Sequence, residues 1–154
     1  MKVVITGGGG FLGKKLARRI LQQGTLADAD GKQQKVSELL LFDVGAASGP
    51  GLDDPRVRAM AGDIANRATV QSIMQGAATV FHFAAVVSAE AEADFDLGYR
   101  VNLDGTRNVL EACRELATNP RVVFTSSLAA YGGDLPPAVT DDTPLTPQTS
   151  YGSQ

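Results

Sequence analysis

The sequence is poor in side chains that bind metals or form disulfides, with one cysteine and one histidine among 154 residues. A disulfide within the chain is impossible. A zinc site or a Ser-His-Asp triad has almost no residues to draw on, so we expect no metal. Cys113 lies in the apolar stripe of a helical pattern and is expected to be a small buried hydrophobe. His82 lies in the apolar run TVFHFAA, which favours a hydrogen-bonded core residue over a catalytic one.

Concentrated positive charge and long apolar runs are also missing. The sequence has fourteen basic and seventeen acidic residues, which gives a net charge of −3, and no basic cluster exceeds two adjacent residues. Nucleic acid is therefore not an expected partner, because phosphate binding needs a concentrated basic face. The longest apolar runs, such as 77–87, fall far short of the ~20 residues of a membrane span. The start MKVVITGG is too short for a signal-peptide core, so we expect a cytoplasmic protein without a membrane partner.

The remaining composition is that of an ordinary globular domain, with 44% hydrophobic and 20% charged residues. Short β-branched runs alternate with helical patterns, which favours an α/β fold built on a Rossmann-type, doubly wound parallel sheet. Residues 25–37 are expected to form a surface loop or a hairpin, and 132–147 a long loop. We expect strands at 2–6, 39–43, 57–63, 79–85 and 121–127, and helices at 11–23, 68–75 and 91–118, the last weakened at Gly98 and Gly105.

A glycine-rich stretch, ITGGGGFLG at 5–13, joins the first expected strand to the first helix. Gly7, Gly10 and Gly13 have the spacing G-x-x-G-x-x-G, although Gly8, Gly10 and Gly13 also satisfy G-x-G-x-x-G. Glycine lets backbone N–H groups approach a pyrophosphate, and the helix N-terminus beyond it supplies unpaired donors and partial positive charge. Between a strand and a helix, this pattern predicts dinucleotide binding.

Two carboxylates end expected strands on the same edge of the sheet. Asp43 follows Gly13 by thirty residues rather than the ~20 of the common pattern, a difference that the polar loop at 25–37 can absorb. An acid there can accept both adenosine ribose hydroxyls and repels a 2′-phosphate, so NAD is favoured over NADP. Asp63 could accept from the adenine amino group or could be only a turn residue.

Together these motifs resemble the extended short-chain dehydrogenase/reductases, the superfamily of sugar-nucleotide epimerases and dehydratases. TGGGGFLG, LFDV, GDI, FHFAA, VNLDGT, FTSSLAAYG and SYG fall in the order typical of that family. The resemblance implies that Ser127 bonds the reacting substrate oxygen and that Tyr151 is the catalytic tyrosine. It implies that Asn102 bonds near the nicotinamide ribose and Thr125 near the nicotinamide. The expected cofactor-binding residues are Gly7, Gly10, Phe11, Leu12, Gly13, Asp43, Asp63, Ile64, Phe83, Ala84, Ala85, Asn102, Thr125 and Tyr151.

More narrowly, VVSAEAEADFDLGYRVNLDGTRNVLEACR with LTPQTSYG resembles family members that oxidise the C2 hydroxyl of a sugar acid such as D-erythronate with NAD. Two alternatives stay open: a nucleotide-sugar epimerase or dehydratase, and a non-catalytic NAD-binding module.

The family pattern also implies more chain than this sequence contains. Its Tyr-x-x-x-Lys motif would place a lysine after Gln154, where it would favour the tyrosine phenolate. We therefore expect residues 1–154 to be an incomplete NAD-binding domain, lacking the last strand and a C-terminal substrate region, and to be inactive alone. The complete protein is expected to be a homodimer.

Overall fold

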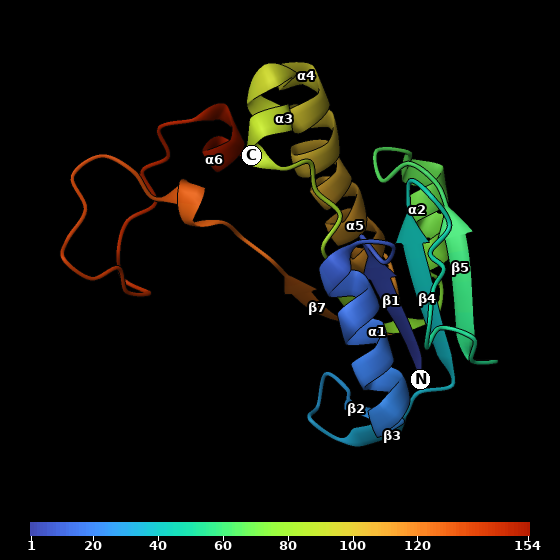
Figure 1. Ribbon diagram of the computed structural model, residues 1–154. Helices are drawn as coiled ribbons and strands as arrows, with labels where there is room; N and C mark the ends of the chain where they lie inside the picture. Colours follow the sequence, from blue (N-terminus) through green and yellow to red (C-terminus); the bar gives the residue numbers. More distant parts are fainter.

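A computed structural model describes residues 1–154 and has a five-stranded parallel sheet at its centre (Figure 1). The strand order is β5-β4-β1-β6-β7, in which each neighbouring pair is parallel. This order places the first strand in the middle and winds the chain outward from it in both directions, the doubly wound arrangement that the sequence predicted. The strands are β1 (Lys2–Thr6), β4 (Glu38–Asp43), β5 (Val57–Ala61), β6 (Ala77–His82) and β7 (Arg121–Phe124).

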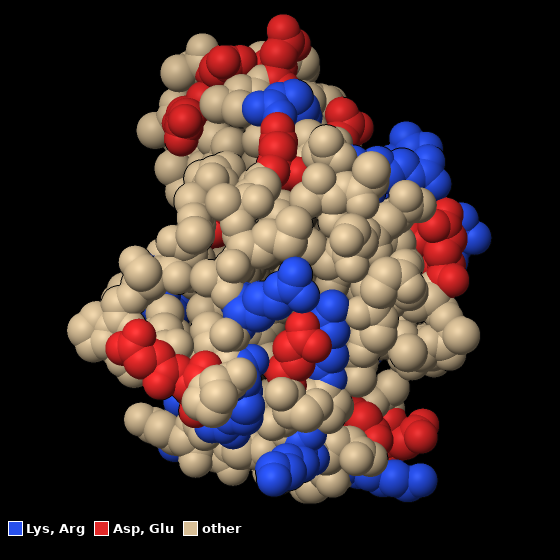
Figure 2. All heavy atoms as spheres, turned by 90° about the vertical axis from the view of Figure 1, so that its right-hand side faces the viewer, with Lys and Arg blue, Asp and Glu red and all other residues tan.

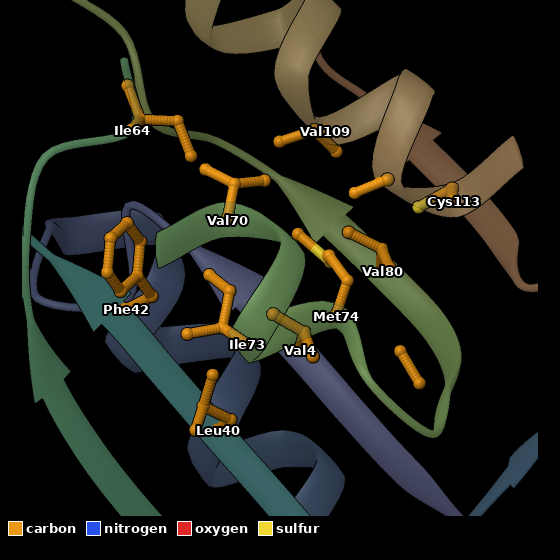
Figure 3. Packing of buried hydrophobic residues seen from close by; sticks show 12 residues of the cluster. Val4, Leu40, Phe42, Ile64, Val70, Ile73, Met74, Val80, Val109 and Cys113 are labelled. Atoms are coloured by element: carbon orange, nitrogen blue, oxygen red, sulfur yellow. The ribbon is translucent and has the colours of Figure 1, made fainter. Parts of the chain in front are cut away.

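Helices cover both faces of the sheet, because side chains alternate between faces along each strand. On one face, Val3 and Ile5 of β1 pack with Ala17 and Ile20 of α1 (Phe11–Gln23). On the other face, Val4 packs against α2 (Arg67–Met74) and α5 (Gly105–Arg114). Figure 3 shows this second core, in which Val70, Ile73, Met74, Val109 and Cys113 converge on the strands. Cys113 is buried as expected, and burial raises the pKa of its thiol.

The long helix expected at 91–118 is in fact divided into shorter pieces. The structure has α3 (Ser88–Ala93), α4 (Phe95–Gly98), a π-helical segment η1 (Tyr99–Asp104) and then α5. Asp94 interrupts the helix with extended backbone angles, and its side chain caps the next piece by accepting from the Leu97 N–H. The glycines expected to weaken the helix, Gly98 and Gly105, flank the π-helical segment. The interruption is therefore a capped turn followed by a local widening of the helix.

Three strands end earlier than their apolar runs suggested. β6 covers 77–82 rather than 79–85, β5 ends at Ala61 rather than 63, and β7 ends at Phe124 rather than 127. The Phe83 N–H donates to the carbonyl of Thr6, which is the last residue of β1. Beyond Thr6 the chain turns into the glycine loop, so the residues after β6 no longer have β1 beside them. The polar stretch at 25–37 forms the hairpin of β2 (Thr25–Ala27) and β3 (Gln33–Lys35).

The C-terminal segment leaves the sheet in a wide excursion and returns (Figure 1). After β7 comes a short 3-10 turn, η2 (Leu128–Ala130), and the chain ends in α6 (Ser150–Ser153). The excursion is closed at its base, where the Thr146 N–H donates to the Ala130 carbonyl and the Thr146 hydroxyl to the Gly132 carbonyl. This closure returns the chain to the end of β7 before α6 begins.

Figure 2 shows that basic and acidic side chains are interleaved on the face turned toward the viewer. None of the helices is both long and apolar enough to cross a bilayer.

Candidate functional site

The glycine loop between β1 and α1 is packed tightly against the backbone that leaves β6. Gly7 has φ of +68°, and a Cβ there would lie 2.7 Å from the carbonyl carbon of Phe83. A Cβ at Gly13 would lie 2.3 Å from the Gly7 oxygen. Both positions therefore exclude a side chain. At Gly10 a Cβ would approach only the Gly7 oxygen, at 3.3 Å, so the space above Gly10 is open.

The N-terminus of α1 points its backbone donors into this open space. No side chain caps the helix, and its first turn holds no acidic residue. By contrast, α2 is capped by Asn66, whose side chain accepts from the Thr69 N–H. The first N–H groups of a helix have no internal partner, so the start of α1 is suited to bind an anion. The side chains of Phe11 and Leu12, at this start, are largely exposed.

A cavity of about 700 Å³ opens beside the glycine loop. The ends of β1, β4, β5 and β6 contribute to its walls, as expected where the carboxyl ends of parallel strands meet. Of the residues predicted from the sequence, it is lined by Gly7, Gly10, Asp43, Asp63, Ile64, Phe83, Ala84 and Ala85. Segments that are far apart in the chain therefore meet at this cavity.

Asp43, at the end of β4, is already tied to the glycine loop. Its Oδ2 accepts from the Gly9 N–H at 2.8 Å, and its Oδ1 accepts from the Val44 N–H at 2.8 Å. A carboxylate oxygen has two lone pairs, so each oxygen can accept a further bond from a ligand in the cavity. Asp43 therefore holds the loop in place while still facing the cavity.

Asp63 is held in a fixed orientation by two partners. Its Oδ1 accepts from the Ala65 N–H at 2.9 Å, and its Oδ2 pairs with the Arg100 guanidinium. The Ala65 N–H, and then Arg100, lower the pKa of this carboxyl. The turn role considered for Asp63 is therefore real, and the residue also lines the cavity. Sequence reasoning missed Arg100, which reaches this cavity from the π-helical segment, a feature that apolar periodicity does not reveal.

A second cavity, of about 260 Å³, adjoins the first and shares Ala84 and Ala85 with it. Of the predicted residues, Asn102, Thr125, Ser127 and Tyr151 line it. The two residues expected to be catalytic are thus brought to one cavity, although 24 positions separate them along the chain.

Ser127 caps the short turn that follows β7. Its Oγ accepts from the Ala129 N–H at 3.2 Å, which is the local backbone bond expected of a strand-end serine. The hydroxyl hydrogen takes no part in that bond, so Ser127 can still donate to a ligand in the second cavity. Nearby, the Thr125 hydroxyl donates to the His82 carbonyl at 3.5 Å.

Asn102 has no free amide hydrogen. Its side-chain oxygen accepts from the Val86 N–H at 2.8 Å, while its nitrogen donates to the Val86 carbonyl at 3.1 Å and to Oε1 of Gln154 at 2.8 Å. The side chain thereby clamps the loop after β6 to the π-helical segment. Its expected bond near a nicotinamide ribose stays a prediction, and the second lone pair of the amide oxygen is the group that could accept such a bond.

His82 is buried beneath the second cavity in a chain of hydrogen bonds that the sequence did not reveal. Its Nδ1 lies 2.6 Å from the Thr6 hydroxyl oxygen and its Nε2 lies 2.9 Å from that of Thr106. The Thr6 oxygen also accepts from the Ala84 N–H, so this hydroxyl links the ring to the loop after β6. Burial lowers the pKa of His82 to about 4, which keeps the ring neutral. The hydrogen-bonded core role expected for His82 is confirmed.

Comparison with known proteins agrees with this arrangement. The sequence pattern of the NAD dependent epimerase/dehydratase family matches residues 3–154. The chain belongs to this family. The family resemblance drawn from the motifs is therefore confirmed.

Two curated relatives within the family have the same name. D-erythronate dehydrogenase from Cupriavidus necator is 58% identical over the whole chain, and that from Haemophilus influenzae is 42% identical. The chain spans 47% and 46% of these two proteins, which is about half the length of each.

Solved structures of family members share the fold. A nucleoside-diphosphate-sugar epimerase from Agrobacterium tumefaciens is 39% identical with a TM-score of 0.87, over 99% of this chain and 45% of that one. A dTDP-glucose 4,6-dehydratase from Streptomyces venezuelae, solved with NAD bound, is 28% identical with a TM-score of 0.81, over 99% of this chain and 48% of that one. The predicted fold class is confirmed.

The neutral, buried His82 predicts a loss of stability in mild acid. Because the pKa falls from its ordinary value of 6.5 to about 4 on folding, only the unfolded chain takes up a proton between these values. The free energy of unfolding should therefore be constant above about pH 6.5 and should fall by roughly 2 kcal/mol on reaching pH 5, at 1.36 kcal/mol per pH unit. Urea unfolding at pH 7.5 and pH 5 measures this change.

His82 is the one histidine among residues 1–154, so its replacement tests the attribution directly. His82→Gln should lower stability at pH 7.5 and should flatten the dependence between pH 7.5 and 5 to within roughly 0.5 kcal/mol. An equally steep decline in this variant would place the titrating group elsewhere.

Proposed function

We propose that this chain forms the NAD-binding part of a dehydrogenase that oxidises the C2 hydroxyl of a small sugar acid such as D-erythronate. The observation that carries this proposal is the junction of the two cavities at Ala84 and Ala85. One cavity has the anion-binding loop and a strand-end carboxylate, and the other has Ser127 and Tyr151. The names of the two curated relatives support the substrate class.

The first cavity suits the adenosine and pyrophosphate part of a dinucleotide. The open space above Gly10 and the uncapped start of α1 suit a pyrophosphate, with the N–H groups of Phe11, Leu12 and Gly13 as donors. The Asp43 carboxylate, facing the same cavity, suits the two adenosine ribose hydroxyls. The adenine would then lie along Ile64 and Asp63, toward Arg100.

The second cavity fits the reacting end of such an enzyme. NAD, when bound, accepts a hydride from the carbon that bears the alcohol. In this proposal Tyr151 takes the hydroxyl proton, and Ser127 donates a hydrogen bond to the oxygen as it loses that proton. Phe83, Ala84 and Ala85 cover the nicotinamide side, and Thr125 lies beside it.

A nucleotide-sugar epimerase is the second candidate, and the name of the Agrobacterium relative favours it. The two activities differ in their net reaction. An epimerase returns the hydride to the sugar and produces no NADH, whereas a dehydrogenase releases one NADH per alcohol oxidised. Formation of NADH from sugar acids, and none from nucleotide sugars, supports the dehydrogenase. A complete gene product that binds NAD but converts neither substrate would support a non-catalytic module.

The carboxylate of Asp43 predicts a preference for NAD over NADP, because it would repel a 2′-phosphate. Asp43→Asn retains an oxygen that can accept from Gly9 while removing the charge, so the loop should stay in place. Calorimetric titration of both cofactors should show that the NAD preference shrinks by about tenfold or more, which corresponds to at least ~1.4 kcal/mol. Equal or tighter binding of NADP by the unaltered protein would refute the assignment.

The roles of Tyr151 and Ser127 predict different losses of rate in the complete gene product with D-erythronate. Tyr151→Phe should abolish NADH formation and leave NAD binding nearly unchanged, because it removes only the proton acceptor. Ser127→Ala should lower kcat by roughly ten- to a thousandfold, the range for loss of one hydrogen-bond donor to the transition state.

Tyr131→Phe provides the matched control, since it deletes the same hydroxyl from a tyrosine outside both cavities. It should retain full activity. Undiminished turnover by Tyr151→Phe would show that the base is another group.

A further inference from the structure

The position of Tyr151 is set by contacts from outside its own helix. Tyr151 lies in the first turn of α6 (Ser150–Ser153), where the backbone N–H groups have no acceptor within the helix. Yet a group that takes a proton during a reaction must lie at a defined place relative to Ser127 and the bound cofactor. The contacts that fix α6 are therefore part of the site.

Two of these contacts fix the end of α6 after Tyr151. Gly152 lies so close to η2 that a Cβ there would be 2.1 Å from the Ala129 carbonyl oxygen. Gln154 accepts a hydrogen bond from Asn102. These contacts tie α6 to the turn that Ser127 caps and to the π-helical segment.

The third contact acts on Tyr151 itself. Glu92, in α3, accepts from the backbone N–H of Tyr151 through Oε1 at 2.8 Å. The two N–H groups that follow have acceptors on Thr149. The N–H of Gly152 donates to the Thr149 hydroxyl at 3.0 Å, and the N–H of Ser153 donates to the Thr149 carbonyl. Glu92 thus satisfies a first-turn donor that the helix leaves unpaired, and a negative charge at this end of a helix is favourable.

Glu92 has no other role that the structure reveals. It is exposed, it lines neither cavity, and it has no ion-pair partner. The Tyr151 N–H is the one hydrogen-bond partner of its side chain.

We propose that Glu92 is a positioning residue that holds the backbone of Tyr151 at a fixed position relative to Ser127. Its importance for catalysis rests on the proposed function, in which Tyr151 takes the substrate proton. Loss of the contact frees the first turn of α6 and spreads the phenol over positions from which proton transfer is slow. Because Glu92 lies outside both cavities, its loss should leave cofactor affinity unchanged.

The test compares Glu92→Ala and Glu92→Gln in the complete gene product, with Asp96→Ala as a matched control. Asp96 is an exposed carboxylate four residues further on, in α4, whose side chain makes no hydrogen bond or ion pair in the structure. The first measurement is the hydrogen-exchange rate of the Tyr151 amide. It should rise by about tenfold in Glu92→Ala, less in Glu92→Gln, which keeps an acceptor oxygen, and not in Asp96→Ala.

The second measurement separates kcat, KM and the Kd for NAD with D-erythronate as substrate. Glu92→Ala should lower kcat by roughly ten- to a hundredfold with the Kd for NAD within about twofold, and Glu92→Gln should recover most of that loss. An unchanged Tyr151 exchange rate, or an unchanged kcat despite faster exchange, would overturn the proposal.

The two measurements also separate this proposal from the proposed function. If the unaltered protein does not oxidise sugar acids, the proposed function fails. The exchange rates still decide whether Glu92 holds Tyr151.

Discussion

The close packing of the glycine loop against the backbone that leaves β6 is the contact on which the rest of the site depends. There is no room for a Cβ at Gly7 or Gly13. Because glycine has no side chain, α1 can begin directly over the end of the sheet. The same packing ends the pairing of β1 with β6, so Phe83 to Ala85 leave the sheet and form the wall shared by the two cavities. A side chain at either glycine would separate the uncapped start of α1 from that wall.

Buried polar groups then fix the site from below and from the side. Below it, the side chains of Thr6, His82 and Thr106 link β1, β6 and α5 by hydrogen bonds. At the side, Asn102 fastens the loop after β6 to the π-helical segment. Such networks are costly to disturb in a low-dielectric interior, so they hold the cavity walls in one arrangement.

Local patterns in the sequence predicted the parts of the structure that depend on local physics. The glycine spacing predicted the loop, apolar periodicity predicted α1 and α2, and the strand-end positions of Asp43 and Asp63 predicted that both would lie at the edge where the first cavity opens. The same patterns missed what depends on distant partners. The end of β6 is set by the turn at Gly7, and the break at Asp94 by a side-chain cap. Arg100, Thr6 and Thr106 are ordinary in sequence and gain their roles from partners in other elements. The family motifs supplied Ser127 and Tyr151, which spacing alone could not have paired.

The central claim is that one continuous cleft holds a dinucleotide with its nicotinamide end beside Tyr151. A crystal structure of the complete gene product grown with NAD tests it most directly. The pyrophosphate should lie on the first turn of α1 above Gly10, the adenosine ribose against Asp43, and the nicotinamide among Thr125, Ser127 and Tyr151. A dinucleotide bound elsewhere, or one whose nicotinamide lies outside the cavity of Ser127 and Tyr151, would contradict the claim.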